Sequence, residues 1–380
     1  MLIALLLSAA SSRAEDGYRL WLRYDLIEDA ALRQSYSSAI TEIVVPEPRP
    51  SLKPAQDELV TALQGLLGTT IPVVPAATRD GALVLMTADA RSQLGGLVTK
   101  DDLLTAGDEG YILRRVTVQG RKQTMLVANH DAGVLYGAFA LLRHLQTHQP
   151  IETLNRVSSP KIQRRLLNHW DNLNGFVERG AAGFSLWEWF QLPEILSPRY
   201  RDYARANASI GINGVVLTNV NANSLVLTEE YLKKVAALAG VFRPYGIRVY
   251  LTARYSAPLE IGDLKTADPL DANVQRWWVD KAAEIYRILP DFGGFLVKAN
   301  SEGQPGPQAY GRNHADGANM LADAVGPFGG IVMWRAFVYD DKVPDDRAKQ
   351  GFNEFQPLDG RFHHNVIVQV KNGPIDFMPR

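Results

Sequence analysis

The sequence has no cysteine among its 380 residues. This absence excludes a disulfide framework, a thiolate metal site and a cysteine nucleophile. It leaves the compartment open, because both cytosolic proteins and secreted bacterial proteins can lack cysteine.

An excess of charge of one sign is also missing. The 40 Lys and Arg residues nearly balance the 41 Asp and Glu residues, so the net charge is −1 at pH 7. Nucleic acids and anionic membranes both require a basic face, and neither is therefore expected as a partner. An anionic small ligand needs only two or three well-placed cations and remains possible. Hydrophobic residues make up 46% of the chain, which is enough to bury the cores of about two domains.

Long hydrophobic runs are absent beyond one short stretch, Leu2–Leu7. Small residues follow it up to Ala14, and Glu15 and Asp16 come next. This pattern predicts a signal peptide over residues 1–14 with cleavage after Ala14, and hence a secreted or periplasmic protein. The lack of Lys or Arg between Met1 and the run departs from the pattern, and the alternative is a frayed apolar start. The run is too short to span a bilayer.

Residues 15–150 mix strand-like and helix-like segments and predict a small N-terminal α+β domain. Apolar spacing of three and four residues indicates helices over 57–67 and 132–145. Two strand runs around Gly120 read as a hairpin. The predicted strands are 20–22, 42–45, 82–86, 111–118 and 123–128.

Residues 151–380 follow a linker at Pro150 and Ser158–Pro160 and show a more regular alternation. Helical stretches such as 228–238 and 274–288 separate the strands, which is typical of parallel βα units. About six units are visible, so we expect a partial (β/α)8 TIM barrel, which has eight when closed. An open doubly wound sheet is the alternative, but no glycine-rich phosphate loop follows the first strand. The predicted strands are 165–170, 214–220, 248–253, 294–298, 331–337 and 365–370.

The sequence ends just after the sixth of these strands. A barrel stopped there would leave unpaired apolar strands, so we expect a chain truncated at the C-terminus. A complete six-stranded open sheet is the alternative.

The chemistry of a barrel lies at the C-terminal ends of its strands. Glu302 and Asp376 follow the fourth and sixth strands, and glycosidases need such a pair of carboxyl groups on either side of the scissile bond. Trp170 and Trp334 offer apolar faces for a sugar ring or methyl group. Three cations belong to the same strand ends and suggest an anionic substrate, because Arg can bind a carboxylate through two hydrogen bonds. These cations are Lys298, Arg335 and Lys371.

Each of these residues also has a purely structural interpretation. Glu302 could cap a helix or form an ion pair, Asp376 could anchor a turn, and Lys298 or Lys371 could pair with those acids. Trp170 could belong to the core. Four histidines match no standard zinc spacing and are expected to be surface or hydrogen-bonded residues, so no metal site is predicted. They are His169, His314, His363 and His364.

Four stretches resemble the α-glucuronidases of glycoside hydrolase family 67, and the resemblance extends over residues 15–380. The last two stretches are long and specific. They are EDGY with LWLRY (15–24), NHWDN (168–172), GFLVKANSEGQPGP (294–307) and VQVKNGPIDF (368–377).

The resemblance implies an inverting exo-enzyme of xylan degradation. It would remove α-1,2-linked glucuronic acid, or its 4-O-methyl ether, from the terminal xylose of xylooligosaccharides. Glu302 is similar to the general acid and Asp376 to one of two carboxylates that activate water. Lys298, Arg335 and Lys371 match cations around the uronic acid. Trp170 and Val220 match the apolar surface that faces the sugar and its methyl ether. No cofactor is implied.

Two further expectations follow from the resemblance. The second base-side carboxylate and the region that carries dimer contacts in the family would lie beyond Arg380, so we expect the 380-residue chain to be inactive or nearly so. A general acid must stay protonated near neutral pH, whereas a neighbouring cation would ionise it. We therefore expect Lys298 to face the sugar rather than Glu302.

Two rival functions remain open on the sequence. One is another barrel glycosidase, such as a hexosaminidase-like enzyme, for which adjacent Asp and Glu residues would be expected after the fourth strand. Ser301 and Glu302 stand there instead. The other is a non-catalytic protein that binds uronates or xylooligosaccharides in the same pocket.

Overall fold

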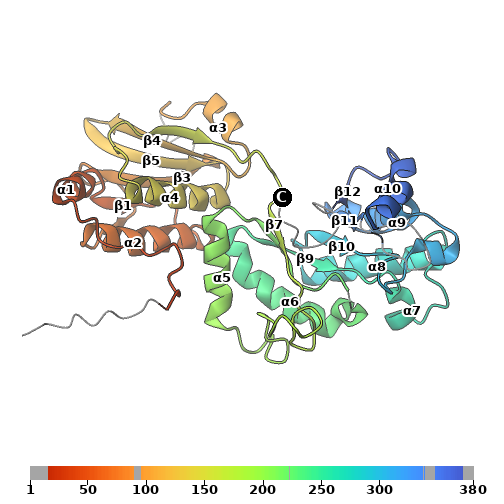
Figure 1. The fold of residues 1–380 in the computed structure, drawn as a ribbon. Helices are drawn as coiled ribbons and strands as arrows, with labels where there is room; N and C mark the ends of the chain where they lie inside the picture. Colours follow the sequence, from red (N-terminus) through yellow and green to blue (C-terminus); the bar gives the residue numbers. More distant parts are fainter. Residues whose placement is uncertain (1–15, 90–95, 222, 337, 339–346, 371–380) are drawn as a thin grey trace, which may run out of the picture. The chain divides into compact units, whose positions relative to one another are not determined.

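The computed structural model of the chain describes residues 16–89, 96–221, 223–336, 338 and 347–370 (Figure 1). The chain divides into two compact units, Met1–Pro48 with Ala55–Ser158, and Arg49–Pro54 with Ser159–Arg380. The predicted signal peptide and its cleavage site lie outside the described residues. Across the described ranges, no helix is long and apolar enough to cross a membrane.

The first unit is built on a mixed six-stranded sheet in the order β2-β1-β3-β5-β4-β6. Strand β4 runs antiparallel to β5 and β6, and the other neighbours are parallel. Helix α3 packs on one face, where it shares an apolar cluster with β3 and β5, and α4 packs across the other face. The strands are β1 (Glu42–Val44), β2 (Val73–Val74), β3 (Ala82–Thr87), β4 (Tyr111–Val118), β5 (Arg121–Ala128) and β6 (Asn155–Ser158), and the helices are α1 (Ala30–Ala39), α2 (Lys53–Leu67), α3 (Lys100–Ala106) and α4 (Asp131–Gln146).

Most of the predicted elements of this unit are confirmed, including both helices and the hairpin. The hairpin turns at Gln119 and Gly120, both with positive φ (48° and 78°), which suits the right-handed twist of the flanking strands. The strand predicted over 20–22 is wrong, because those residues form turns. Leu20 has a φ of 53°, which a strand does not adopt, and Leu20 and Trp21 are exposed whereas Leu22 is buried.

The second unit is a parallel sheet whose six strands follow one another in chain order, β7-β8-β9-β10-β11-β12 (Figure 1). An open doubly wound sheet reverses its strand order, so that alternative is wrong. The sequential curled sheet confirms an incomplete TIM barrel. The strands are β7 (Leu166–Asn168), β8 (Gly214–Val216), β9 (Arg248–Thr252), β10 (Gly294–Val297), β11 (Ile331–Arg335) and β12 (Val366–Gln369), and the helices are α5 (Pro198–Ser209), α6 (Glu229–Phe242), α7 (Ala257–Ile261), α8 (Ala272–Ile288), α9 (His314–Val325) and α10 (Arg347–Phe355).

Alternate residues of these strands belong to two different apolar clusters. The larger cluster joins the outer side of the sheet to α5, α6, α8 and α9. The smaller one lies on the inner side and contains Val216, Tyr250, Leu296 and Met333. This period of two follows from the pleat of a strand, which sends neighbouring side chains to opposite faces.

The same alternation corrects one prediction about the site. Trp334 is fully buried in the outer cluster, where its indole N–H donates to His314 Nδ1 at 3.1 Å, so it offers no face to a sugar. Arg335 is the next residue and therefore projects to the opposite side. Two consecutive residues of one strand cannot both point into the same site. His314 is itself held by Glu354, which lies 2.9 Å from its Nε2.

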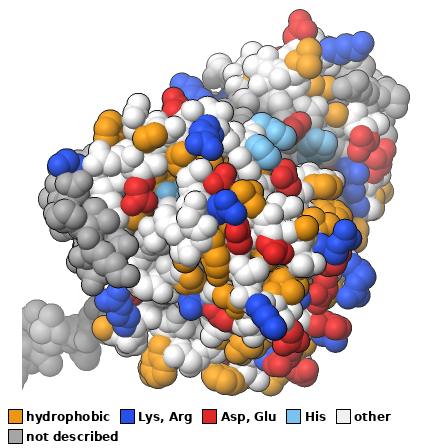
Figure 2. All heavy atoms as spheres, turned by 90° about the vertical axis from the view of Figure 1, so that its right-hand side faces the viewer, with side chains coloured by type: hydrophobic (Ala, Val, Ile, Leu, Met, Phe, Trp, Pro, Cys, Tyr) orange, Lys and Arg blue, Asp and Glu red, His pale blue; other side chains and the backbone are white. Residues whose placement is uncertain are grey.

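On the face shown in Figure 2, basic, acidic and apolar side chains are interspersed, as the near-zero net charge leads one to expect.

Candidate active site

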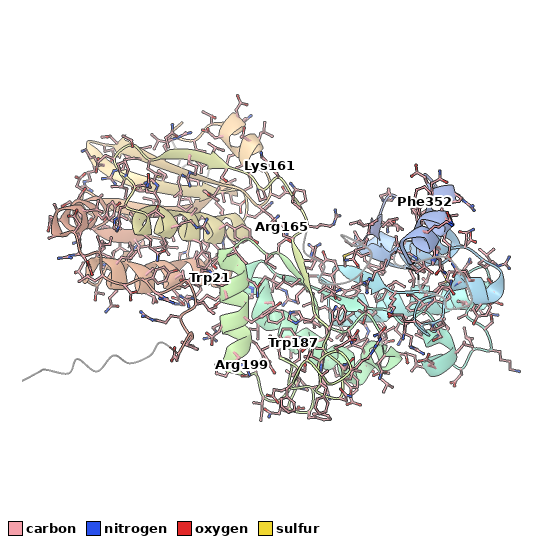
Figure 3. All side chains as sticks on the ribbon, in the orientation of Figure 1. Trp21, Lys161, Arg165, Trp187, Arg199 and Phe352 are labelled. Carbon is pink, nitrogen blue, oxygen red and sulfur yellow. The ribbon has the colours of Figure 1, made fainter. Side chains whose placement is uncertain are left out.

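The segment after β7 folds back on itself as an irregular hairpin over residues 171–185. Isolated antiparallel bridges join Asp171 to Val177 and Phe176 to Phe184. Just beyond it, Trp187 is buried and its indole N–H donates to the Leu217 carbonyl at 2.9 Å. Arg165 directly precedes β7, and Trp187 follows the hairpin; both are labelled in Figure 3. The hairpin is thus fixed at the C-terminal end of the sheet, where a barrel places its chemistry.

Asp171 holds the two ends of the hairpin together. Its buried carboxylate accepts hydrogen bonds from Ser185 Oγ at 2.5 Å and from Leu186 N at 2.7 Å. His169 lies 3.3 Å away through Nδ1, and its Nε2 is 2.8 Å from Tyr203 Oη. Burial alone would raise the pKa of Asp171, but the hydrogen bonds from His169 and Ser185 outweigh it and hold the pKa below its usual range.

We expect Asp171→Asn to lower the free energy of unfolding by about 1–3 kcal/mol at neutral pH, because an amide cannot accept the same set of charge-assisted hydrogen bonds. A carboxyl whose pKa is depressed by folding stabilises the native state above its unfolded pKa of about 3.9, and that contribution disappears as the pH falls through the lower folded value. Urea unfolding of both proteins between pH 7 and pH 3 measures this. A gap that stays constant over that range would contradict the assignment.

A cavity of about 690 Å³ opens between this hairpin and the ends of β8 and β9. Its lining is rich in amide side chains, with Asn172, Asn174, Asn219, Asn221 and Asn223, and it also includes Phe176, Glu178, Arg179, Arg254 and Glu260. Amides donate and accept hydrogen bonds, so such a wall suits the hydroxyl groups of a sugar.

Glu302 stands in a tight turn just after β10. The turn runs from Ser301 to Gln304, with a hydrogen bond of 2.9 Å from Gln304 N to Ser301 O. Glu302 and Gly303 both have positive φ, 49° and 77°, and Asn300 has a φ of 51°. Non-glycine residues held in this region concentrate at functional sites, because the surrounding structure must stabilise them. Arg254 steadies the turn by donating to the Gln304 side chain at 2.9 Å.

Lys298 comes just after β10, and Glu302 follows in the tight turn. The two side chains form an ion pair. Lys298 Nζ is 2.5 Å from Glu302 Oε2 and 2.7 Å from Asn221 Oδ1, which belongs to the cavity wall. The prediction that Lys298 faces away from Glu302 is therefore wrong. A lysine that is 4% exposed needs an anionic partner, and Glu302 is within reach.

Arg335, at the end of β11, is a second buried cation near Lys298. Burial is the main cause of a lowered pKa at Lys298, and the charges of Arg335 and Arg179 lower it further, whereas Glu302 raises it. Lys298, Glu302 and Arg335, predicted as one site, are thus close enough to influence one another.

Two cavity residues that the sequence did not reveal extend this charge cluster. Arg179 Nη2 lies 3.9 Å from Glu302 Oε1, and Arg179 Nε lies 3.4 Å from Glu178 Oε1. Glu178 has a φ of 55°, and its backbone N–H donates to the Trp170 carbonyl at 2.8 Å. Both residues belong to the hairpin, some distance after β7, so a rule that selects strand ends could not find them.

The remaining predicted residues have different surroundings. Trp170 is half-buried at the base of the hairpin. Val220 is 3% exposed and belongs to the inner apolar cluster of the sheet. Lys371 and Asp376 lie outside the described residues. Within the described ranges, no group of three or more His, Asp or Glu side chains is placed to hold a metal ion.

Comparison with known proteins identifies relatives along the whole chain. The family described as "Glycosyl hydrolase family 67 N-terminus" matches residues 20–141, and "Glycosyl hydrolase family 67 middle domain" matches residues 144–380. The chain is 40% identical to Alpha-glucuronidase A of Emericella nidulans over 399 residues, and 40% identical to Alpha-glucuronidase of Hypocrea jecorina over 401 residues. In both cases all of this chain matches 46% of the relative, so it spans less than half of their length.

Solved structures resemble the fold at low sequence identity. A GH138 enzyme targeting pectin rhamnogalacturonan II matches 87% of this chain and 38% of its own, with a TM-score of 0.51 and 16% identity. CpGH84D matches 88% of this chain and 52% of its own, with a TM-score of 0.52 and 12% identity. At such identities the likeness concerns the fold alone, whereas the family match covers most of the sequence and decides against a hexosaminidase-like assignment. The chain belongs to glycosyl hydrolase family 67.

Proposed function

We propose that this site serves an α-glucuronidase, which hydrolyses the α-1,2 link between glucuronic acid, or its 4-O-methyl ether, and the terminal xylose of a xylooligosaccharide. The observation that carries the proposal is the cluster of Lys298, Arg335 and Arg179 around Glu302 beside an amide-rich cavity. Buried cations next to a carboxyl group suit a substrate that combines an anionic group with a glycosidic bond. The names of the fungal relatives support the same activity.

In the proposed reaction, Arg335 and Lys298 hold the uronate carboxylate, and Glu302 gives its proton to the oxygen of the departing xylose as the bond from that oxygen to the anomeric carbon breaks. A water molecule attacks the anomeric carbon from the opposite face and passes a proton to Asp376. The product then has inverted configuration. Inverting enzymes separate the two carboxyl groups by roughly 6.5–9.5 Å so that this water fits between them.

The pairing of Lys298 with Glu302 places one condition on this mechanism. Two cations near Glu302 favour its ionised form, whereas a general acid must hold a proton. A bound uronate carboxylate competes with Glu302 for the same cations. We infer that substrate binding draws Lys298 and Arg179 from Glu302 and so allows it to take up the proton that it later donates.

The condition also gives weight to a second candidate, a non-catalytic uronate-binding protein, because a permanently ionised Glu302 would bind cations without donating protons. The two candidates differ in turnover. Binding of glucuronic acid without release of uronic acid from aldotriouronic acid would favour the second.

In a protein of the same length as the relatives, we expect Glu302→Gln to reduce release of uronic acid from aldotriouronic acid by roughly 100- to 10,000-fold, the range for loss of a general acid. The same variant should lose far less with a 4-nitrophenyl α-glucuronide, because nitrophenolate departs without protonation. Glu229→Gln, on the exposed side of α6, is the matched control and should leave both rates unchanged. Equal losses on the two substrates would exclude Glu302 as the acid.

Some wider features of the protein are proposals as well. We propose export to the periplasm or the medium, where glucuronoxylan oligosaccharides occur, and a role in xylan degradation without an organic cofactor or metal. A homodimer is proposed for the full-length protein, as the resemblance implies.

A further inference from the structure

An exposed group of aromatic rings stands at the rim of the cavity. Phe176 is 42% exposed, and Phe184 is 81% exposed. The rings of Phe176 and Phe184 lie against each other, with centroids 5.4 Å apart and planes tilted by 33°. Phenylalanine side chains exposed together in this way usually mark a binding surface, because their exposure costs free energy in water.

The backbone that carries these rings is held in place by hydrogen bonds. The bridge between Phe176 and Phe184 fixes the pair, and Val177 N donates to Gly183 O at 2.9 Å. Asn172 accounts for two further hydrogen bonds to the Phe176 carbonyl, from its backbone N–H at 2.9 Å and its side chain at 3.0 Å. The buried Asp171 anchors the whole hairpin. The rings are therefore presented on a rigid support.

This surface is continuous with the cavity. Phe176 lines the cavity itself, and the ring of Phe184 packs against the ring of Phe176. The cavity lining combines asparagine side chains with charged ones. The asparagines could hydrogen-bond the hydroxyl groups of a neutral sugar chain attached to the anionic group, while the two rings contact its apolar faces.

We propose that Phe176 and Phe184 form an aromatic subsite for neutral xylose units on the leaving-group side of the scissile bond. A xylose ring has no hydroxymethyl group, so its C–H bonds form a flat apolar face that stacks on an aromatic ring while its hydroxyl groups remain in water. This assignment rests on the proposed uronate-releasing function, because that function supplies the neutral chain.

The test measures dissociation constants by titration calorimetry for glucuronic acid, for aldouronic acids with one to four xylose units, and for neutral xylotetraose. We expect affinity to rise by roughly fivefold to tenfold as the second and third xylose units are added, the range for one or two aromatic contacts. Phe176→Ala with Phe184→Ala should remove that gain and abolish xylotetraose binding, but leave glucuronic acid affinity unchanged. Phe352→Ala is the matched control, since Phe352 is 67% exposed on α10 (Figure 3).

The outcomes separate the two proposals. Affinity that does not depend on chain length, or a gain that survives the double substitution, overturns the aromatic subsite. Failure of glucuronic acid to bind at all overturns the proposed function, while the xylotetraose measurement still decides the subsite. Sedimentation of the same variants tests whether a second copy of the chain, instead of a sugar, covers the rings. A wild-type dimer that becomes a monomer on the double substitution, without change in sugar binding, would assign the rings to a second copy of the chain.

Discussion

Lys298→Met is expected to weaken binding of glucuronic acid by at least about 30-fold, the lower bound for removing one partner of a buried, hydrogen-bonded charge pair. Lys298 is 4% exposed and holds both Glu302 and Asn221, at 2.5 and 2.7 Å. Without its charge, the uronate carboxylate would meet the carboxylate of Glu302 with one cation fewer between them, and like charges repel strongly at short range away from water.

The effect of Lys298→Met on stability should be small. Burial lowers the pKa of Lys298, so the charged form is held in the folded state at a cost. Methionine keeps the length of the side chain without that cost. We therefore expect the free energy of unfolding to fall by no more than about 1 kcal/mol, as at other sites where function opposes stability.

Calorimetric titration with glucuronic acid, together with urea unfolding, measures both quantities. Lys233→Met is the matched control, because Lys233 lies on the exposed side of α6 and its ion pair with Glu229 is at the surface. Adding Glu302→Gln to Lys298→Met should recover part of the lost affinity, since it removes the repelling charge. If Lys298→Met unfolds the chain while binding by the folded fraction is unchanged, Lys298 is a structural residue and the proposed uronate site is wrong.

Gly294→Ala is expected to destabilise the second unit by about 4 kcal/mol or more, or to prevent folding. Gly294 begins β10 with a φ of 128°, a conformation that side chains rarely allow. A Cβ atom there would lie 1.9 Å from the carbonyl oxygen of Ile331 on β11, which is backbone and cannot move aside. Because Gly294 and Ile331 are register partners, the clash would disturb the strand that leads to Lys298 and Glu302.

Gly240→Ala provides the contrast. Gly240 lies within α6, and a Cβ atom there would meet nothing within 4 Å. Alanine is the better helix former by roughly 0.5–1 kcal/mol, so this variant should be slightly more stable than the wild type. Urea unfolding of both variants checks the pair. Comparable stability of the two would mean that β10 and β11 are not paired in the register described.

The sequence was sufficient to predict the parallel βα pattern and the strand ends at which the site lies. Strand β4 was predicted at its observed bounds, and each barrel strand falls within its predicted range, because buried strands between amphipathic helices have a strong local signature. The rule that barrel strands carry their chemistry at the C-terminal end selected Lys298, Glu302 and Arg335, and the fold brings these three together.

Other features of the site depended on tertiary structure. Trp334 and Arg335 are neighbours in the sequence, but the pleat of β11 sends them to opposite faces, and which face was inner was fixed only by the packing of α9. Glu178 and Arg179 reach Glu302 because an irregular hairpin, anchored by a buried carboxylate, folds back over the sheet. The sequence by itself determined which chemical groups are available and on which strand they stand. Only the tertiary structure decided which charges meet, because ion pairing depends on distances and burial that long-range packing sets.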